Sequence, residues 1–562
     1  MKEGVHKVKE LLNSIYGHEK GREAFARIMP LIEAFPQRPR RNSSYFSEKD
    51  VILITYGDTL NHPGEPPLRT LHRFLTSHLK NMVSGIHFLP FFPFSSDDGF
   101  SVVDFYTIDP ELGCWNDVEA IGREFTLMLD YVVNHFSSKS EWFHNYLAEC
   151  KGFDAFAMEV DSAENLSKVT RPRSQPLLSK YRKKSGETVN LWTTFSADQI
   201  DFNFKSLDVL EKMVQVLLHY IDKGASILRL DAIAYLWKEI GTPCIHLPQT
   251  HAMVKLLRCI LDLTAPDTII LTETNVPHEE NISYFGDNGD EAQMVYNFTL
   301  PPLLLHAFTT QDASFLSDWA RTLHLGAPDT TFFNFTASHD GIGVRPLEGI
   351  LEPKEIDRLI SLVEAHNGQV SYKTDPDGSK SPYELNITYV DAILANEKKM
   401  AAQKFMASQA IQYVLPGVPA TYIHSLLGSR NWVEGVRQTG RTRSINREKL
   451  DLLPVETELS DAASFRAKTF QAYGRLMKIR RKQPAFHPKA GFEILDTDPS
   501  VFAVKRYCLE QEIMALTNIS RQKQMVELGG ISQGPSRMDL ITGKPVVGDI
   551  IELEPYQYQW LV

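Results

Sequence analysis

Two residues of opposite charge stand inside an apolar segment of this chain. Residues 226–232, Ser-Ile-Leu-Arg-Leu-Asp-Ala, have the composition of a buried strand, and Arg229 and Asp231 lie two positions apart in it. In a β-strand that spacing puts both side chains on one face. A cation and a carboxylate on a buried face must be paired or functional, because neither is stable there alone. A structural salt bridge and a reactive site are therefore both open interpretations of the pair.

Two further apolar segments lead to a carboxylate in the same way. Residues 269–272, Ile-Ile-Leu-Thr, are followed by Glu273, and residues 331–335, Thr-Phe-Phe-Asn-Phe, lead to His339 and Asp340. Parallel strands that close into a barrel bring their C-terminal ends to one face, where such proteins build their active sites. The three carboxylates are therefore expected to meet at that face.

The composition is that of a large globular protein. The chain has 562 residues, of which 43% are hydrophobic and 23% charged, so it is long enough for several domains and a large core. Its net charge of -11 argues against a nucleic-acid-binding protein with a basic surface. Five scattered cysteines without a CxxC motif predict free thiols in a reducing cytoplasm. We expect neither a secretory signal nor a membrane span, because no apolar run has the required length.

Apolar strands alternate with helical patterns over most of the chain. Repeated strand–helix units predict a parallel sheet covered by helices, and eight units favour an α/β fold with a (β/α)8 barrel over an open sheet. The expected strands are 51–56, 85–90, 127–135, 226–232, 269–275, 292–298, 331–335 and 413–423. The helices expected between them include 70–81, 207–222, 249–263 and 394–411.

Two breaks in the alternation predict insertions into the barrel. They lie at 136–205, after the third strand, and at 343–393, after the seventh, and insertions of this size commonly form a lid or a small subdomain. The barrel is then expected in three parts, with an N-terminal helical segment before it and an antiparallel β domain after it. The expected bounds are 1–45 for the helical segment, 46–135, 206–342 and 394–487 for the barrel, and 488–562 for the β domain.

Four short motifs together resemble the signatures of glycoside hydrolase family 13, the α-amylase family. They occur in the family's order, each at the end of a predicted strand: Asp-Tyr-Val-Val-Asn-His at 130–135, Arg-Leu-Asp-Ala at 229–232, Thr-Glu at 272–273 and His-Asp at 339–340. The resemblance implies that Asp231 is the nucleophile, Glu273 the general acid/base and Asp340 a carboxylate that binds sugar hydroxyls. It implies that Arg229, His135 and His339 hold the sugar. Taken singly, each histidine is more simply a satisfied core residue.

These roles agree with the chemistry of a retaining glycosyl transfer, which needs two carboxyl groups about 5–5.5 Å apart. Arg229, on the same strand face, is expected to keep Asp231 ionised. Burial and neighbouring negative charge are expected to raise the pKa of Glu273, so that it carries a proton for the leaving group.

Further segments resemble sucrose phosphorylase and its relatives, in which phosphate replaces water as the incoming nucleophile. The resemblance implies that Asp97 and Arg443 clamp the glucose, and that Phe100 is its aromatic platform. It also implies that Phe195 and Gln199 line the entrance and that Arg173 and Tyr235 contact phosphate, which requires charge-assisted donors. Arg173 as an ordinary loop cation and Tyr235 as a core ring remain alternatives. The segments are 97–100, 170–173, 191–201, 300–306, 338–343 and 443–447.

One position departs from sucrose phosphorylases, which have a histidine two residues beyond the acid/base. This chain has Asn275 there, and in this it is closer to the glucosylglycerate phosphorylases. The favoured hypothesis is release of α-D-glucose 1-phosphate from 2-O-α-D-glucosylglycerate through a covalent glucosyl-aspartate. Sucrose 6′-phosphate, glucosylglycerol and sucrose are the alternative donors. Four cations on the two insertions are candidates for the glycerate carboxylate: Arg171, Arg173, Lys373 and Lys380.

Two other classes of function stay open. An α-glucoside hydrolase would share every catalytic residue and differ only in letting water reach the intermediate, and a non-catalytic relative would act as a scaffold. We expect no metal, because the mechanism needs none and no His/Asp/Cys cluster has ligand spacing. The expected partners are a small glucoside and inorganic phosphate as co-substrate, without a cofactor, nucleic acid or membrane. A homodimer is implied by the resemblance alone.

Overall fold

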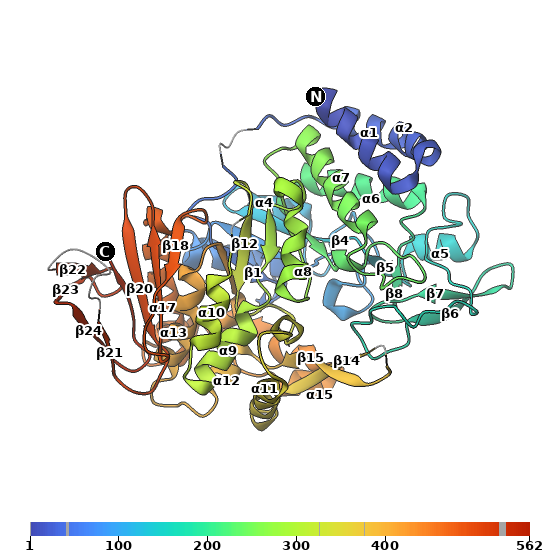
Figure 1. Ribbon diagram of the computed structural model, residues 1–562. Helices are drawn as coiled ribbons and strands as arrows, with labels where there is room; N and C mark the ends of the chain where they lie inside the picture. The colour runs from blue at the N-terminus through green and yellow to red at the C-terminus, as the bar shows by residue number, and fades with distance from the viewer. Residues whose placement is uncertain (1, 41–43, 325, 376, 528–535) are drawn as a thin grey trace.

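Eight parallel strands close into a barrel at the centre of the molecule (Figure 1). The structure is a computed structural model that describes residues 2–40, 44–324, 326–375, 377–527 and 536–562. The strands follow one another around the barrel in chain order, which confirms the predicted (β/α)8 fold. They are β1 (Ile52–Thr55), β3 (Gly85–Phe88), β4 (Thr126–Val132), β9 (Ala225–Asp231), β10 (Ile269–Thr272), β11 (Met294–Tyr296), β12 (Thr331–Phe335) and β16 (Val418–Tyr422).

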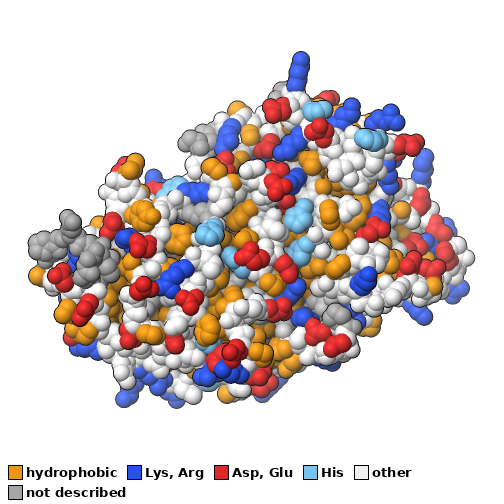
Figure 2. All heavy atoms as spheres, in the orientation of Figure 1, with side chains coloured by type: hydrophobic (Ala, Val, Ile, Leu, Met, Phe, Trp, Pro, Cys, Tyr) orange, Lys and Arg blue, Asp and Glu red, His pale blue; other side chains and the backbone are white. Residues whose placement is uncertain are grey.

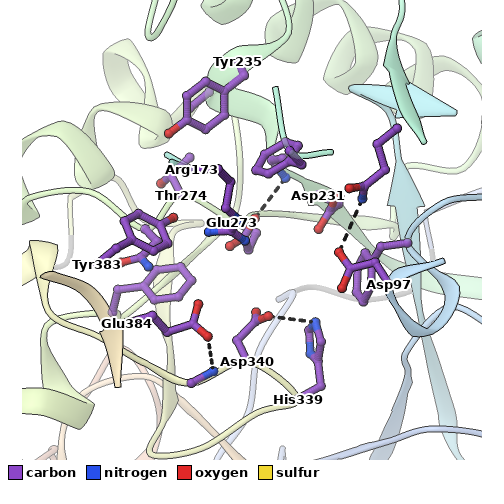
Figure 3. Close-up of a pocket in the computed structure, with 18 of the residues that line it drawn as sticks. Asp97, Arg173, Asp231, Tyr235, Glu273, Thr274, His339, Asp340, Tyr383 and Glu384 are labelled. Carbon is purple, nitrogen blue, oxygen red and sulfur yellow. Dashed lines mark hydrogen bonds and ion pairs between the residues drawn. The ribbon is translucent and has the colours of Figure 1, made fainter. Parts of the chain in front are cut away.

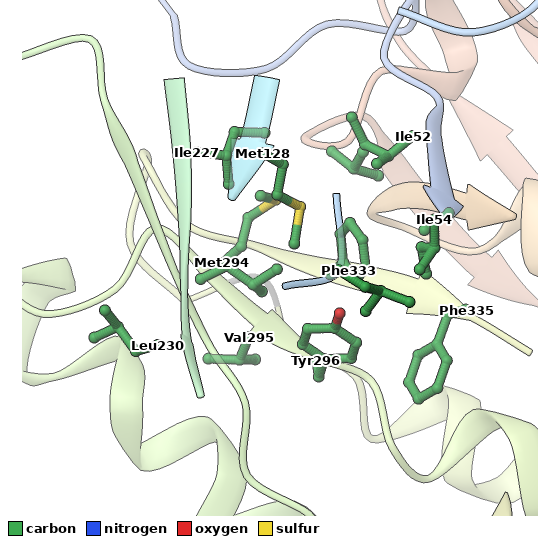
Figure 4. Packing of buried hydrophobic residues seen from close by; sticks show 14 of the residues in the cluster. Ile52, Ile54, Met128, Ile227, Leu230, Met294, Val295, Tyr296, Phe333 and Phe335 are labelled. Carbon is green, nitrogen blue, oxygen red and sulfur yellow. The ribbon is translucent and has the colours of Figure 1, made fainter. Parts of the chain in front are cut away.

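The inside of the barrel changes from apolar to charged along its strands. Met128, Ile227 and Met294 are buried and pack against one another near the N-terminal ends of their strands (Figure 4). On β9 the same face carries Arg229 two residues after Ile227, and Asp231 two residues after that. The apolar layer therefore supports a charged mouth at the C-terminal ends of the strands, as the period of the strand requires.

Helices cover the outside of the barrel. Two of them have almost the predicted bounds, α6 (Leu207–Asp222) and α7 (Pro248–Thr264). The N-terminal helices α1 (Lys2–Tyr16) and α2 (His18–Ala34) form a hairpin that packs against α7 and α6 (Figure 1). The helix predicted at 70–81 is α3 (Pro67–Phe74), which continues as a π-helix to Leu79.

One boundary differs from the prediction of a helix at 394–411 and a strand at 413–423. The structure has α12 (Tyr389–Leu394) and α13 (Ala401–Val414), and β16 begins only at Val418. Almost every residue of α13 and β16 is buried, so helix and strand merge into one apolar run in which periodicity cannot locate the boundary.

The third predicted strand, 127–135, is also divided. Its first part is β4, but His135 belongs to β5 (His135–Ser137), which pairs antiparallel with β8 (Gln199–Asp201). The segment between them contains α5 (Glu141–Leu147) and the hairpin β6 (Leu178–Arg182)–β7 (Thr188–Trp192). His135 thus lies where the barrel strand has already turned toward the first insertion.

The second insertion forms a small sheet that reaches the first. It contains α11 (Pro353–Ala365) and three strands in the order β13 (Ile342–Gly343), β15 (Lys380–Asn386) and β14 (Gln369–Thr374). An isolated bridge pairs Arg171 of the first insertion with Thr374 of β14. The two insertions therefore meet beside the mouth of the barrel (Figure 1).

The last part of the chain is an antiparallel β domain, as predicted. A buried face packs on α13, and α17 (Phe465–Arg480) lies beside that helix (Figure 1). The main sheet has the order β18 (Gly491–Ile494), β19 (Val501–Tyr507), β20 (Glu512–Asn518), β25 (Tyr558–Leu561), β22 (Ser536–Asp539) and β23 (Lys544–Val547). A separate pair is formed by β21 (Gln524–Glu527) and β24 (Ile550–Leu553).

Charged side chains of both signs are interspersed over the face shown in Figure 2. Among the helices of the described ranges, none combines the length and the apolar character needed to cross a membrane.

Candidate active site

A pocket lies at the C-terminal mouth of the barrel. All fourteen residues to which the resemblance gives a place in the glucose and phosphate sites line it, although they come from the ends of several strands, from the loops after them and from the first insertion. The fourteen residues are Asp97, Phe100, His135, Arg173, Phe195, Gln199, Arg229, Asp231, Tyr235, Glu273, Asn275, His339, Asp340 and Arg443.

Arg229 is the centre of the charged network at the floor of the pocket. The residue is only 2% exposed, and its Nη1 donates to Asp231 Oδ1 at 2.9 Å and also to Asp130. Its Nη2 lies 3.9 Å from Glu273 Oε2. Asp130 Oδ2 in turn lies 2.8 Å from His87 Nε2. The guanidinium therefore interacts with three carboxylates, which compensate its charge inside the barrel.

The carboxyls of Glu273 and Asp231 are held side by side. The backbone N–H of Ala232, the residue after Asp231, donates to Glu273 Oε2 at 2.9 Å. Ala232 has a φ of +51°, so the chain turns sharply at the end of β9. Figure 3 shows Asp231, Glu273 and Asp340 around the same open space.

Both members of this carboxyl pair are pushed toward the protonated form. Burial raises the pKa of Glu273, and the charge of Asp340 adds to the shift while Arg229 opposes it. Burial likewise raises the pKa of Asp231 well above its usual value; Arg229 opposes this shift, while the charges of Glu273, Asp130 and Asp340 add to it. Arg229 thus lowers the pKa of Asp231, as expected, but does not offset the effect of burial. The two carboxyls titrate as a coupled pair.

Asp340 is the carboxylate that stays ionised most readily. Arg443 Nη1 lies 2.5 Å from its Oδ1, and His339 Nε2 lies 3.4 Å from the same oxygen. Burial raises the pKa of Asp340, but the guanidinium groups of Arg443, Arg447 and Arg229 bring it below its usual value. An ionised carboxylate in this position can accept hydrogen bonds from sugar hydroxyls.

The aromatic and amide groups of the site pack into the same wall. The ring of Phe100 stacks on His339, with centroids 4.7 Å apart and planes 8° apart. His135 Nε2 donates to the carbonyl of Phe100 at 2.9 Å, and Gln199 Nε2 donates to Asp97 Oδ2 at 3.4 Å. The residues predicted to hold the sugar thus contact one another as well as the pocket.

Arg173 stands apart from the other two arginines of the pocket. Its guanidinium lies 5.6 Å from the ring centre of Phe195 and 5.1 Å from that of Tyr383, and its Nη1 donates to the carbonyl of Pro172 at 3.3 Å. No carboxylate of the described residues forms an ion pair with it. Tyr235 packs edge-on against Phe195, and burial raises the pKa of its phenol, so it remains a hydrogen-bond donor.

The other cations predicted to meet glycerate do not line the pocket. Arg171 donates to the backbone carbonyl of Gln175. Lys373 Nζ lies 2.5 Å from Asp375 within the turn of its own hairpin, and Lys380 is exposed. A charged residue in a Gly/Pro-rich turn is more easily satisfied locally than across a pocket, which explains why these three cations do not line it.

Sequence reasoning missed two pocket residues on β15, Tyr383 and Glu384. A signal was present, since residues 381–386 follow a Gly-containing turn and alternate in the manner of a strand that returns to the barrel. Their partners, by contrast, come from distant segments and could not be read from local pattern.

A buried ion pair supports the pocket from behind. Lys238 Nζ lies 2.7 Å from Asp201 Oδ2 and donates to Asn134 Oδ1 at 2.8 Å, and the Asp201 side chain is fully buried. This pair ties β8 of the first insertion to the loop after β9, which also carries Tyr235. In the ranges that the structure describes, no group of three or more His, Cys, Asp or Glu side chains is placed to hold a metal ion.

Several known proteins are similar to this chain in sequence or in fold. Residues 77–341 match the family described as "Alpha amylase, catalytic domain". A glucosylglycerate phosphorylase of Spirochaeta thermophila is 47% identical over 533 residues, covering 93% of this chain and 90% of that protein. A glucosylglycerate phosphorylase of Escherichia coli is 43% identical over 559 residues, 99% of each chain. The crystal structure of sucrose 6F-phosphate phosphorylase from Thermoanaerobacter thermosaccharolyticum has a TM-score of 0.76 and 24% identity, covering 90% of this chain and 99% of that one.

Proposed function

Since the chain belongs to the α-amylase family, glycoside hydrolase family 13, and to its phosphorylase branch, we propose that it is a retaining glucoside phosphorylase. Its donor is 2-O-α-D-glucosylglycerate, and its products are α-D-glucose 1-phosphate and glycerate. This agrees with the resemblance of the four motifs and with the names of the two relatives that span nearly the whole chain.

In the first half-reaction Asp231 attacks the anomeric carbon of the donor. The bond from that carbon to O2 of glycerate breaks, and Glu273 gives its proton to the departing oxygen. The shared proton of the carboxyl pair is drawn to Glu273 when the glycosidic oxygen lies beside it, which leaves Asp231 ionised for attack. The product is a glucosyl ester of Asp231 with inverted configuration at the anomeric carbon.

In the second half-reaction phosphate takes the place of glycerate. The ionised Glu273 accepts a proton from phosphate, a phosphate oxygen attacks the anomeric carbon, and the ester bond to Asp231 breaks. Two inversions give net retention, so the product is the α-anomer. The reaction uses phosphate as co-substrate and needs no cofactor.

The observation that carries the proposal is the unpaired cation at the acceptor end. Arg229 and Arg443 already have carboxylate partners, whereas Arg173 has none among the described residues. An unpaired guanidinium in a half-buried position is suited to an anion. Glycerate brings a carboxylate and leaves before phosphate enters, so Arg173 can serve both anions in turn.

The test is incubation of the purified protein with each candidate donor, with and without phosphate. The donors are glucosylglycerate, sucrose 6′-phosphate, glucosylglycerol and sucrose, and the readouts are glucose 1-phosphate and free glucose. We expect phosphate-dependent glucose 1-phosphate, fastest from glucosylglycerate. Glucose release at the same rate with and without phosphate would instead identify a hydrolase, and faster turnover of another donor would reassign the acceptor.

The proposal also includes a cellular location and an oligomeric state. All five cysteines are free thiols, which supports a cytoplasmic location. The resemblance further supports a homodimer, which light scattering of the purified protein tests.

A further inference from the structure

Glu384 is a buried carboxylate of the pocket wall to which the mechanism above gives no role. It lies on β15 and is 2% exposed. Its Oε1 accepts the backbone N–H of Gly341 and the Nε of Arg443, both at 2.9 Å, and its Oε2 accepts Arg443 Nη2 at 2.5 Å. Figure 3 shows the carboxylate directed toward Asp340. Three N–H donors therefore converge on one side chain.

The guanidinium that Glu384 holds has a second partner in the site. Arg443 Nη1 lies 2.5 Å from Asp340 Oδ1, the carboxylate proposed to bind glucose hydroxyls. Glu384 and Asp340 thus fix the guanidinium from two sides. Bidentate pairing of this kind determines orientation as well as position.

The backbone of the same strand reaches the other end of the pocket. Tyr383, the residue before Glu384, lies under Arg173, and Glu384 is paired with Gly343 of β13 in the sheet. Two neighbouring side chains of one strand therefore contact the two ends of the pocket separately.

We propose that Glu384 is a positioning residue that sets the affinity for the glucosyl group by holding Arg443 against Asp340. This inference rests on the proposed function. Among the described residues, the hydrogen bonds of the Glu384 side chain go to Gly341 and Arg443 at the glucose end, and none goes to Arg173 or Tyr235.

The isosteric variant Glu384→Gln separates these effects. A carboxylate offers two acceptor oxygens to the three N–H donors, whereas an amide offers one oxygen and turns an NH₂ group toward a donor. Arg443 therefore loses its fixed orientation. The pocket also loses one of its five carboxylates, Asp97, Asp231, Glu273, Asp340 and Glu384, and a dianion such as phosphate enters a less negative pocket more easily.

The experiment measures KM for glucosylglycerate and for phosphate in E384Q and wild type. We expect KM for the glucoside to rise about 10- to 100-fold, as for a lost hydrogen bond to a charged group, and KM for phosphate to stay equal or fall. The matched control is E291Q, because Glu291 is equally buried and bonded to His251 at 2.9 Å but lies outside the pocket. A joint rise of both KM values, or no change in either, would overturn the proposal.

A double variant tests separately whether Glu384 acts through Arg443. If Glu384 acts through Arg443, then E384Q added to R443A raises KM for the glucoside no further, and additive effects contradict the proposal. A protein that hydrolyses the glucoside without using phosphate would refute the proposed function, yet the KM for the glucoside in hydrolysis would still test Glu384.

Discussion

The two ends of the pocket use arginine in opposite ways. At the glucose end, Arg229 is paired with Asp130 and Asp231, and Arg443 with Asp340 and Glu384. At the acceptor end, Arg173 lies over the rings of Phe195 and Tyr383 without a carboxylate partner among the described residues.

This difference indicates what each end recognises. Glucose is neutral, so its end is built as a closed network of protein charges that presents fixed donors and acceptors. The acceptor end has a charge that the protein leaves uncompensated, and the glycerate carboxylate or phosphate completes it. Arginine is thus a positioning group at one end and a ligand contact at the other.

The largest expected effect comes from the glucose end. In D231N the nucleophile is lost while the size of the side chain is kept, so formation of glucose 1-phosphate should fall on the order of 10⁴-fold or more. Initial rates with saturating glucosylglycerate and phosphate measure this. A variant that keeps a tenth of the activity would exclude Asp231 as nucleophile.

The second largest effect is expected from the buried ion pair of Lys238 and Asp201, which lies behind the pocket. Lys238→Met leaves the Asp201 carboxylate buried without its cation, which should lower the free energy of unfolding by about 3–5 kcal/mol. Urea unfolding measures this, and K238M with D201N should recover part of the loss because the pair is then neutral. The control is Lys223→Met, a more exposed pair with Glu119 at 3.3 Å, expected to cost under about 1 kcal/mol. Equal losses in the two lysine variants would contradict the account.

Much of the charged network could be predicted from the sequence, because its residues stand at the ends of recognisable strands. Residues 226–232 have an alternating pattern that fixes which side chains share the inner face, so Arg229 and Asp231 meet as predicted. The partners of Lys238 and Glu384 could not be found this way, since Asp201 and Arg443 come from other segments. The pKa of Asp231 was also beyond local reasoning, because it depends on burial in the assembled barrel and on carboxylates delivered by three other strands.

The acceptor end gives an effect of intermediate size. R173A removes the one pocket guanidinium without a carboxylate partner in the described chain, so KM for phosphate should rise about 10- to 100-fold. In the same variant, kcat/KM should fall less for glucosylglycerol, which has no carboxylate, than for glucosylglycerate. R173K should recover part of the affinity for phosphate. Equal losses for the two donors would show that Arg173 does not contact the carboxylate.

The pH dependence is expected to show the smallest change and reports on the carboxyl pair. Activity needs one proton on the pair, so kcat/KM for the glucoside should fall at low pH, where both are protonated, and at high pH, where neither is. Burial raises both pKa values. Both the acidic and the basic limb of the kcat/KM profile should therefore have pKa values above the ordinary carboxyl pKa values of about 3.9 and 4.3. A basic limb at or below those values would contradict the assignment of the buried pair.

The most direct test of the account is to trap the covalent intermediate. E273Q should react with α-D-glucosyl fluoride, whose leaving group needs no proton, and mass spectrometry of the digested protein should find one glucosyl group on the peptide that contains Asp231. Addition of phosphate should release that group as α-D-glucose 1-phosphate, more slowly than in the wild type, because the phosphate dianion can attack through an ionised oxygen without the Glu273 base. A glucosyl group on any other residue, or its release as free glucose at a rate that phosphate does not change, would contradict the account.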